Sequence, residues 1–310
     1  ARVVRLGMTH LRQALNDKPI HIIGYSTGAA LALDFALQAE QGEAQPEPAS
    51  LVLISPAIGL SPGAVLAQWG RRLSVLPGLG RLAWLDIMPE FDPYKYNSFT
   101  TNAAEQVHRL TSSVAQRIAA RAKTDPELPP VLVIKSTVDA TVSNNAVVDR
   151  LLLQLAPQRH QMVLFDINRF ATHASILVDD PGPFTRRLLE DKQLPFGVTL
   201  LSNARPDSSA VNAWYKPPNA AGPTDIEALT MHWPSGILSL SHVALPFPPD
   251  DPIYGAQRPM KTDTVFLGAQ ALQGERGMLK IPGDFLLRLR YNPFYDYMQK
   301  RIEQWLEDPI

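Results

Sequence analysis

The sequence predicts an α/β fold in which helices flank a mostly parallel sheet. Short apolar runs typical of buried strands alternate with segments of helical periodicity, as parallel βαβ units require. The apolar runs lie at residues 20–23, 51–56, 131–136, 161–167, 197–201 and 237–241, and the helical segments at residues 3–15, 103–123, 183–192 and 294–306. With 310 residues the chain can bury a large core, so we expect a single domain over residues 1–310.

The first predicted strand leads directly into a motif that carries chemistry. Residues Gly24-Tyr25-Ser26-Thr27-Gly28 match G-x-S-x-G and join that strand to a helix rich in small residues. In this setting the motif predicts a nucleophile elbow, a sharp and strained turn that exposes the serine hydroxyl. The two glycines should let strand and helix pass closely, and the Thr27 N–H should point into an oxyanion hole at the start of the helix. The alternative is a glycine-flanked turn whose serine caps the helix.

This motif resembles that of the α/β-hydrolase superfamily, in particular its esterase and lysophospholipase-like serine hydrolases. The resemblance is carried by residues 24–28, the Asp139 loop and the His242 segment, and it covers most of the chain weakly outside them. It implies a Ser-His-Asp triad, an acyl-enzyme, and no metal or organic cofactor. In this family several strands and an oxyanion loop, often containing His-Gly, precede the nucleophile strand. The sequence contains no His-Gly dipeptide, so we expect those strands to lie upstream of Ala1.

A carboxylate follows the predicted strand at residues 131–136. The loop after that strand contains Asp139, and the family presents its third triad member just beyond the carboxyl end of a late strand. We therefore expect Asp139 to hold the imidazole in one tautomer. The alternative is that Asp139 caps a helix predicted over residues 143–156. Asp125, which precedes a proline, and Asp166, at the end of a strand, are weaker candidates.

Two of the seven histidines are candidates for the general base. Counting strands favours His173, which follows the strand after the Asp139 loop. Local context favours His242, because it directly follows the apolar run at 237–241 and its surroundings resemble a histidine loop of such hydrolases. We favour His242 and keep His173 as the alternative. The remaining histidines lie on predicted helices, in or at the start of strands, or in a loop-rich region: His10, His21, His108, His160 and His232.

Two segments interrupt the strand–helix alternation. Residues 58–100 carry apolar and aromatic residues at irregular spacing, which predicts a cap or lid that lines an acyl pocket. The alternative for this insertion is a helical excursion that packs its own core. Residues 203–234 are rich in proline, asparagine and alanine, which predicts a loop-rich excursion over the sheet.

Composition narrows the function classes. The net charge is −1 without a basic block, so we expect no nucleic-acid partner. The absence of cysteine excludes disulfides, thiolate catalysis and cysteine-ligated metals. No apolar run is long enough for a transmembrane helix. Together with the G-x-S-x-G motif, the resemblance to α/β hydrolases implies a serine hydrolase of carboxylic esters with a small-molecule or lipid-like substrate. The alternatives are lysophospholipase or serine aminopeptidase-like activity, or a catalytically silent scaffold used for binding.

Overall fold

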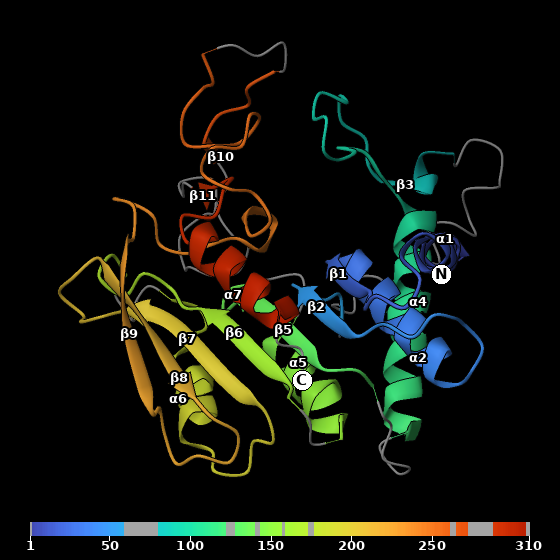
Figure 1. Ribbon diagram of the computed structural model, residues 1–310. Helices are drawn as coiled ribbons and strands as arrows, with labels where there is room; N and C mark the ends of the chain where they lie inside the picture. Colours follow the sequence, from blue (N-terminus) through green and yellow to red (C-terminus); the bar gives the residue numbers. More distant parts are fainter. Residues whose placement is uncertain are drawn as a thin grey trace.

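A computed structural model describes residues 2–58, 80–121, 128–139, 143–156, 159–172, 177–260, 265–271 and 288–307 (Figure 1). Its centre is a seven-stranded sheet in the order β1-β2-β5-β6-β7-β8-β9. The strands are β1 (His21–Tyr25), β2 (Ser50–Ile54), β5 (Val131–Ser136), β6 (Gln161–Phe165), β7 (Gly197–Asn203), β8 (Ala210–Lys216) and β9 (Asp225–His232). The first five run parallel to one another, β8 pairs antiparallel with β7, and β9 pairs antiparallel with β8. The predicted mostly parallel sheet with flanking helices is confirmed.

Helices cover both faces of this sheet. The described α-helices are α1 (Arg2–Leu15), α2 (Thr27–Glu40), α4 (Thr101–Arg121), α5 (Asn144–Arg150), α6 (Gly182–Glu190) and α7 (Tyr295–Glu307). One core layer joins the sheet to α2, α4, α5 and α6, and a second joins its other face to α7 and the segment from Trp233 to Leu245. In Figure 1, α7 crosses in front of the sheet, and α5 and α6 lie behind it. No helix within the described residues has the length and apolarity needed to cross a membrane.

The alternation of side chains along β5 builds these two layers. Val131 and Val133 belong to the layer with α2 and α4, whereas Leu132 and Ile134 belong to the layer with α7. All six residues of β5 are buried, as expected for a strand between two parallel neighbours with both faces covered. The continuous apolar runs in the sequence therefore correspond to the central strands.

The prediction of a loop-rich excursion over residues 203–234 is wrong for most of that segment. β8 and β9 occupy it and extend the sheet as antiparallel strands. Burial alternates over much of β8, where Val211 and Ala213 are buried and Asn212 and Trp214 are partly exposed. Three of the five prolines that suggested a loop lie in the turn between the two strands, at residues 217–224.

Two further elements differ from expectation. Residues 237–241 do not form a strand; instead, the backbone N–H and side-chain amide of Asn168 donate to the carbonyls of Leu238 and Ile237 at 2.7 and 2.8 Å. The helix predicted over 143–156 divides into α5 and a 3-10 turn, η2 (Leu152–Gln154).

Only the later part of the predicted cap at 58–100 is described, because residues 59–79 lie outside the described ranges. Residues 80–100 form a 3-10 turn, η1 (Gly80–Ala83), and a small antiparallel pair, β3 (Trp84–Asp86) with β4 (Phe99–Thr100). A second small pair, β10 (Gln270–Ala271) with β11 (Arg288–Leu289), precedes α7. In Figure 1 the β3–β4 segment and the loops with β10 and β11 project on the same side of the sheet, the upper one in this view.

Candidate active site

Ser26 occupies a strained turn between β1 and α2. Its φ is 53° and its ψ is −116°, in the left-handed half of φ space that residues with a side chain rarely adopt. The turn is held at the end of the neighbouring strand: the Ser26 N–H donates to the Ile54 carbonyl at 2.9 Å, and the Ala57 N–H donates to the Ser26 carbonyl at 3.2 Å. Strain of this kind persists only where surrounding contacts enforce it, and it is common at functional sites.

The side chain of Ser26 does not serve as a helix cap. Ser26 stands at the N-cap position of α2, but it makes no side-chain capping hydrogen bond. The alternative of a capping serine is therefore wrong. Thr27 is the first residue of α2, and the first N–H groups of a helix have no partner within the helix. Its position is the one that a donor to a developing oxyanion needs.

The two glycines of the motif differ in what they do. A Cβ at Gly24 would lie 2.6 Å from the Ala29 Cα and 2.7 Å from both the Ala29 nitrogen and the Gly28 carbonyl oxygen. The close passage of strand and helix therefore requires glycine at position 24. Among the described residues, a Cβ at Gly28 would meet nothing within 4 Å, so the expectation that this glycine also makes room is wrong.

Asp139 and His242 meet although they are distant in the sequence. Asp139 follows the carboxyl end of β5, and its Oδ1 lies 3.5 Å from Nδ1 of His242. The Asp139 side chain is fully buried and that of His242 is 15% exposed. The other carboxylate oxygen, Oδ2, accepts from Nζ of Lys135 at 2.6 Å. A buried carboxylate facing one imidazole nitrogen is the arrangement that orients a general base.

The path of the chain before His242 explains this meeting. The bonds from Asn168 hold residues 237–238 beside the end of β6, and Leu238 packs against a small buried cluster with Ile167 and Leu177. His242 then begins a 3-10 turn, η4 (His242–Ala244). The Tyr25 hydroxyl, next to Ser26, donates to the His242 carbonyl at 3.4 Å. This contact brings the histidine turn against the end of β1.

The matching family model is described as a thioesterase domain and covers residues 1–76, which contain α1, β1, the Ser26 turn, α2 and β2. The fold is an α/β fold with a mostly parallel sheet, and the strand–turn–helix unit around Ser26 lies within the matched residues. Among proteins of curated function, no sequence matches the chain.

Similar solved structures include lipases. A monoacylglycerol lipase from Paleococcus ferrophilus is 17% identical, with 53% of this chain and 64% of that chain covered and a TM-score of 0.38. A soluble variant of monoglyceride lipase from Saccharomyces cerevisiae is 11% identical, with 53% and 57% covered and a TM-score of 0.39. A structure from work on the metagenome-derived lipolytic enzymes LipS and LipT is 16% identical, with 51% and 59% covered and a TM-score of 0.37. The chain thus spans less than two thirds of these proteins.

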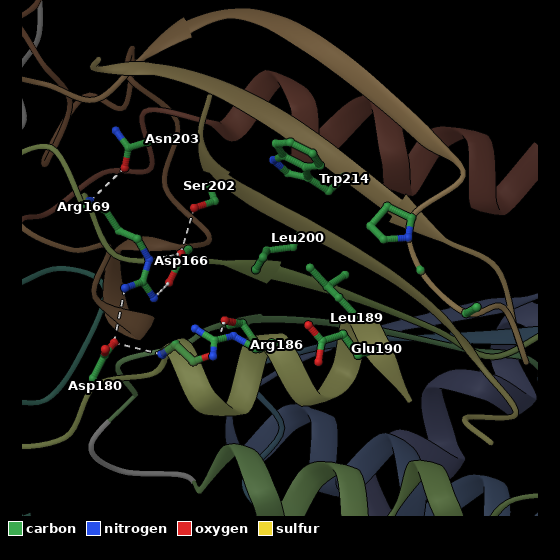
Figure 2. A pocket seen from close by; sticks show the side chains of 15 residues that line it. Asp166, Arg169, Asp180, Arg186, Leu189, Glu190, Leu200, Ser202, Asn203 and Trp214 are labelled. Carbon is green, nitrogen blue, oxygen red and sulfur yellow. Dashed lines mark hydrogen bonds and ion pairs between the residues drawn. The ribbon is translucent and has the colours of Figure 1, made fainter. Parts of the chain in front are cut away.

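The structure decides between the roles predicted for two of the three acidic residues. Asp139 does not cap α5, because Ser143 does so by accepting from the Ala146 N–H at 3.3 Å. Asp125 lies outside the described residues. Asp166 is held by other partners, which Figure 2 shows: Nε and Nη2 of Arg169 donate to its two oxygens at 2.8 and 3.2 Å.

Asp166 belongs to a separate pocket. The Ser202 hydroxyl donates to its Oδ2 at 2.8 Å. Nη1 of Arg169 forms a second ion pair, with Oδ1 of Asp180 at 3.2 Å. These groups line a pocket of about 660 Å³ between α6 and the ends of β6 and β7, with Trp214 and Leu200 on its apolar side (Figure 2). Ser26, Asp139 and His242 do not line this pocket.

Two of the other histidines contact strands of the sheet, and the alternative base lies outside the described residues. His173, the alternative base, lies outside the described ranges. His160 is buried; its Nδ1 accepts from the Val131 N–H at 3.1 Å, and burial lowers its pKa to about 4. His21 lies 2.8 Å from the Ser50 hydroxyl through Nδ1, and partial burial lowers its pKa. Both histidines therefore make structural contacts with strands of the sheet.

The segment between β3 and β4 contacts the loop that follows His242. The Tyr94 ring stacks on Phe247 with centroids 5.2 Å apart, and its hydroxyl donates to Asp251 at 3.0 Å. The Tyr254 hydroxyl in turn donates to Asp92. Burial, followed by the neighbouring carboxylates, raises the pKa of both tyrosines, so these hydroxyls stay protonated and can donate. The predicted cap is thereby tied to the histidine side of the site.

Proposed function

We propose that the chain is a serine hydrolase that cleaves carboxylic esters with Ser26 as nucleophile, His242 as general base and Asp139 as its orienting carboxylate. The observation that carries this proposal is the contact between Asp139 and His242 next to a strained serine turn. The match of residues 1–76 to a thioesterase domain model supports the same class of chemistry. The proposed reaction uses no metal or organic cofactor.

The chemistry has two halves. The Ser26 hydroxyl oxygen attacks the ester carbonyl carbon while His242 Nε2 takes the hydroxyl proton, and the Thr27 N–H stabilises the oxyanion. The bond to the alcohol breaks as His242 returns that proton to the leaving oxygen. Water then attacks the acyl-enzyme, passes a proton to His242, and releases the acid as the proton returns to Ser26.

The β3–β4 segment supports a substrate with an acyl chain. Its large apolar side chains are exposed rather than packed into a core of their own, and a cluster of such residues on a surface favours a ligand or lipid contact. The exposed residues are Leu82, Trp84, Leu85, Ile87, Met88, Phe91, Tyr94, Tyr96 and Phe99. Because the segment is tied to the loop after His242, we propose that it acts as the cap over the acyl group.

Thioester cleavage is a second candidate, because the matching family model is described as a thioesterase domain. A panel of substrates separates the candidates: p-nitrophenyl esters of increasing chain length, aryl thioesters with the same acyl groups, lysophosphatidylcholine and aminoacyl p-nitroanilides. We expect esters or thioesters to give the highest kcat/KM. Turnover of the anilides above both groups would contradict an ester hydrolase and support an aminopeptidase.

A fluorophosphonate probe tests the nucleophile itself. We expect Ser26→Ala to lose both labelling and turnover. Ser55→Ala is the matched control, because Ser55 also has a positive φ, of 44°, at the end of the neighbouring β2, and its hydroxyl has no hydrogen-bond partner among the described residues. A wild-type chain that neither reacts with the probe nor turns over any substrate would refute the proposal and favour a silent scaffold.

A further inference from the structure

Lys135 is a fully buried lysine on the central strand β5. It stands two residues after Val133 and therefore faces the same apolar layer, between the sheet and α2 and α4. Leu164 is its register partner on β6. An ammonium group in such a place loses its hydration, and only a paired, hydrogen-bonded negative charge compensates for that loss.

The compensating group is the carboxylate of Asp139. Lys135 Nζ lies 2.6 Å from its Oδ2, and both side chains are fully buried. The other oxygen, Oδ1, is the one that faces His242 Nδ1 at 3.5 Å. A lysine ammonium carries donors and no acceptor, so the oxygen opposite it accepts. The carboxylate is thus held through Oδ2 by the lysine, while Oδ1 faces the histidine.

We propose that Lys135 is a positioning residue for the general base: its ammonium holds Oδ2 of Asp139, so that Oδ1 faces His242 and accepts a hydrogen bond from its Nδ1–H. The proton then stays on Nδ1, and the lone pair of Nε2 remains available for the Ser26 proton. Without the ammonium, the carboxylate loses the contact that turns Oδ1 to the histidine, and the preference for this tautomer weakens. Its effect on turnover rests on the proposed function, whereas its effect on the tautomer does not.

A structural role alone makes a different prediction. If the ion pair only stabilised the end of β5, its loss would lower the free energy of unfolding and leave the histidine tautomer and the kcat of the folded protein unchanged. The role proposed here shifts the tautomer and lowers kcat while KM changes little, because Lys135 acts on the general base. The tautomer and the split between kcat and KM therefore distinguish the two roles.

The kinetic test compares Lys135→Met with a matched control. Lys216 is a second fully buried lysine, on β8, and two strands, β6 and β7, lie between it and β5 in the sheet. We expect Lys135→Met to lose kcat by about 100-fold or more at pH 7 with KM within about threefold, and Lys216→Met to keep both within about threefold. We expect Lys135→Arg, which retains the charge, to recover at least about tenfold of the lost kcat.

A double-mutant cycle shows whether Lys135 acts through Asp139. In the Asp139→Asn background, we expect Lys135→Met to cause little further loss of kcat, because the group through which Lys135 acts is already neutral. Additive losses would overturn the proposal. The double variant also leaves no uncompensated buried charge, so it can be compared even where Lys135→Met alone folds poorly.

The deciding readout is the tautomer of His242, observed by nitrogen NMR of the imidazole ring in the wild type and in Lys135→Gln. We expect the proton on Nδ1 in the wild type at pH 7, and a shift toward the other tautomer in the variant. The same tautomer in both proteins would overturn the proposal. An inactive wild-type chain with the expected tautomer shift would instead refute the proposed function and leave the role of Lys135 supported.

Discussion

Gly24→Ala tests directly whether the Ser26 turn depends on close passage of β1 and α2. The new methyl group would lie 2.6 Å from the Ala29 Cα and 2.7 Å from the Ala29 nitrogen and the Gly28 carbonyl oxygen. Ordinary carbon contacts lie at about 3.5–4.0 Å, so strand and helix must separate by about 1 Å. All three neighbours are backbone atoms, and no side-chain rotation can relieve the contact.

This displacement should affect stability and catalysis together. Overpacking a well-packed site costs about 1–3 kcal/mol of the free energy of unfolding. A misplacement of about 1 Å between reacting groups costs about 100-fold in rate. We therefore expect kcat of Gly24→Ala to fall by about 100-fold, measured with a p-nitrophenyl ester at saturation, and its urea midpoint to decrease.

Gly28→Ala is the matched control within the same motif. In the part of the chain that the structure describes, nothing lies within 4 Å of a Cβ at position 28, and alanine is the better helix former by about 1 kcal/mol. We expect unchanged or higher stability and a kcat within about threefold of the wild type. Equal losses in the two variants, or full activity of Gly24→Ala, would refute the reasoning about the turn.

Three other side chains give predictions for stability and selectivity. Burial lowers the pKa of His160 to about 4, so below about pH 6.5 the unfolded chain binds a proton that the folded chain does not. The free energy of unfolding should therefore fall by roughly 3 kcal/mol between pH 6.5 and 4, and the fall should be smaller in His160→Gln. Urea unfolding at each pH measures this, and an equal fall in the two proteins would contradict the prediction. Asp166→Asn should lower stability by about 1–3 kcal/mol with kcat within about threefold, whereas Asp139→Asn should lower kcat by about 10⁴-fold; a catalytic loss of that size in Asp166→Asn would reverse the assignment. Trp84→Ala should change the ratio of kcat/KM between long and short acyl esters, since each methylene is worth about 1–3 kcal/mol, and an unchanged ratio would make the segment a scaffold.

Features encoded within a few residues were predictable from the sequence. The apolar runs of β2, β5 and β6 are continuous because both faces of these strands are covered. The Ser26 turn was predictable because glycine, serine and the flanking strand and helix all lie within one short stretch. The role of Gly28 was overestimated, since the motif alone does not tell which glycine meets a neighbouring backbone.

Features that depend on distant partners were not predictable in the same way. The local composition predicts loops at β8 and β9 because three prolines lie in the turn between them, whereas their strand character comes from pairing of β8 with β7 and of β9 with β8. The run at 237–241 is apolar enough for a strand, but its Ile237 and Leu238 carbonyls accept hydrogen bonds from Asn168 rather than from a neighbouring strand. Nothing in the local sequence marks Lys135, because its significance arises only where Asp139 and His242 meet.

The most direct test of the central claim compares the two candidate histidines. His242→Ala and His173→Ala are assayed for kcat with a saturating p-nitrophenyl ester and for labelling of Ser26 by a fluorophosphonate. The contact of Asp139 with His242 predicts that His242→Ala loses several orders of magnitude in kcat and most of the labelling rate, as expected for a triad member, whereas His173→Ala changes kcat only a few-fold. An inactive His173→Ala beside a fully active His242→Ala would contradict the account.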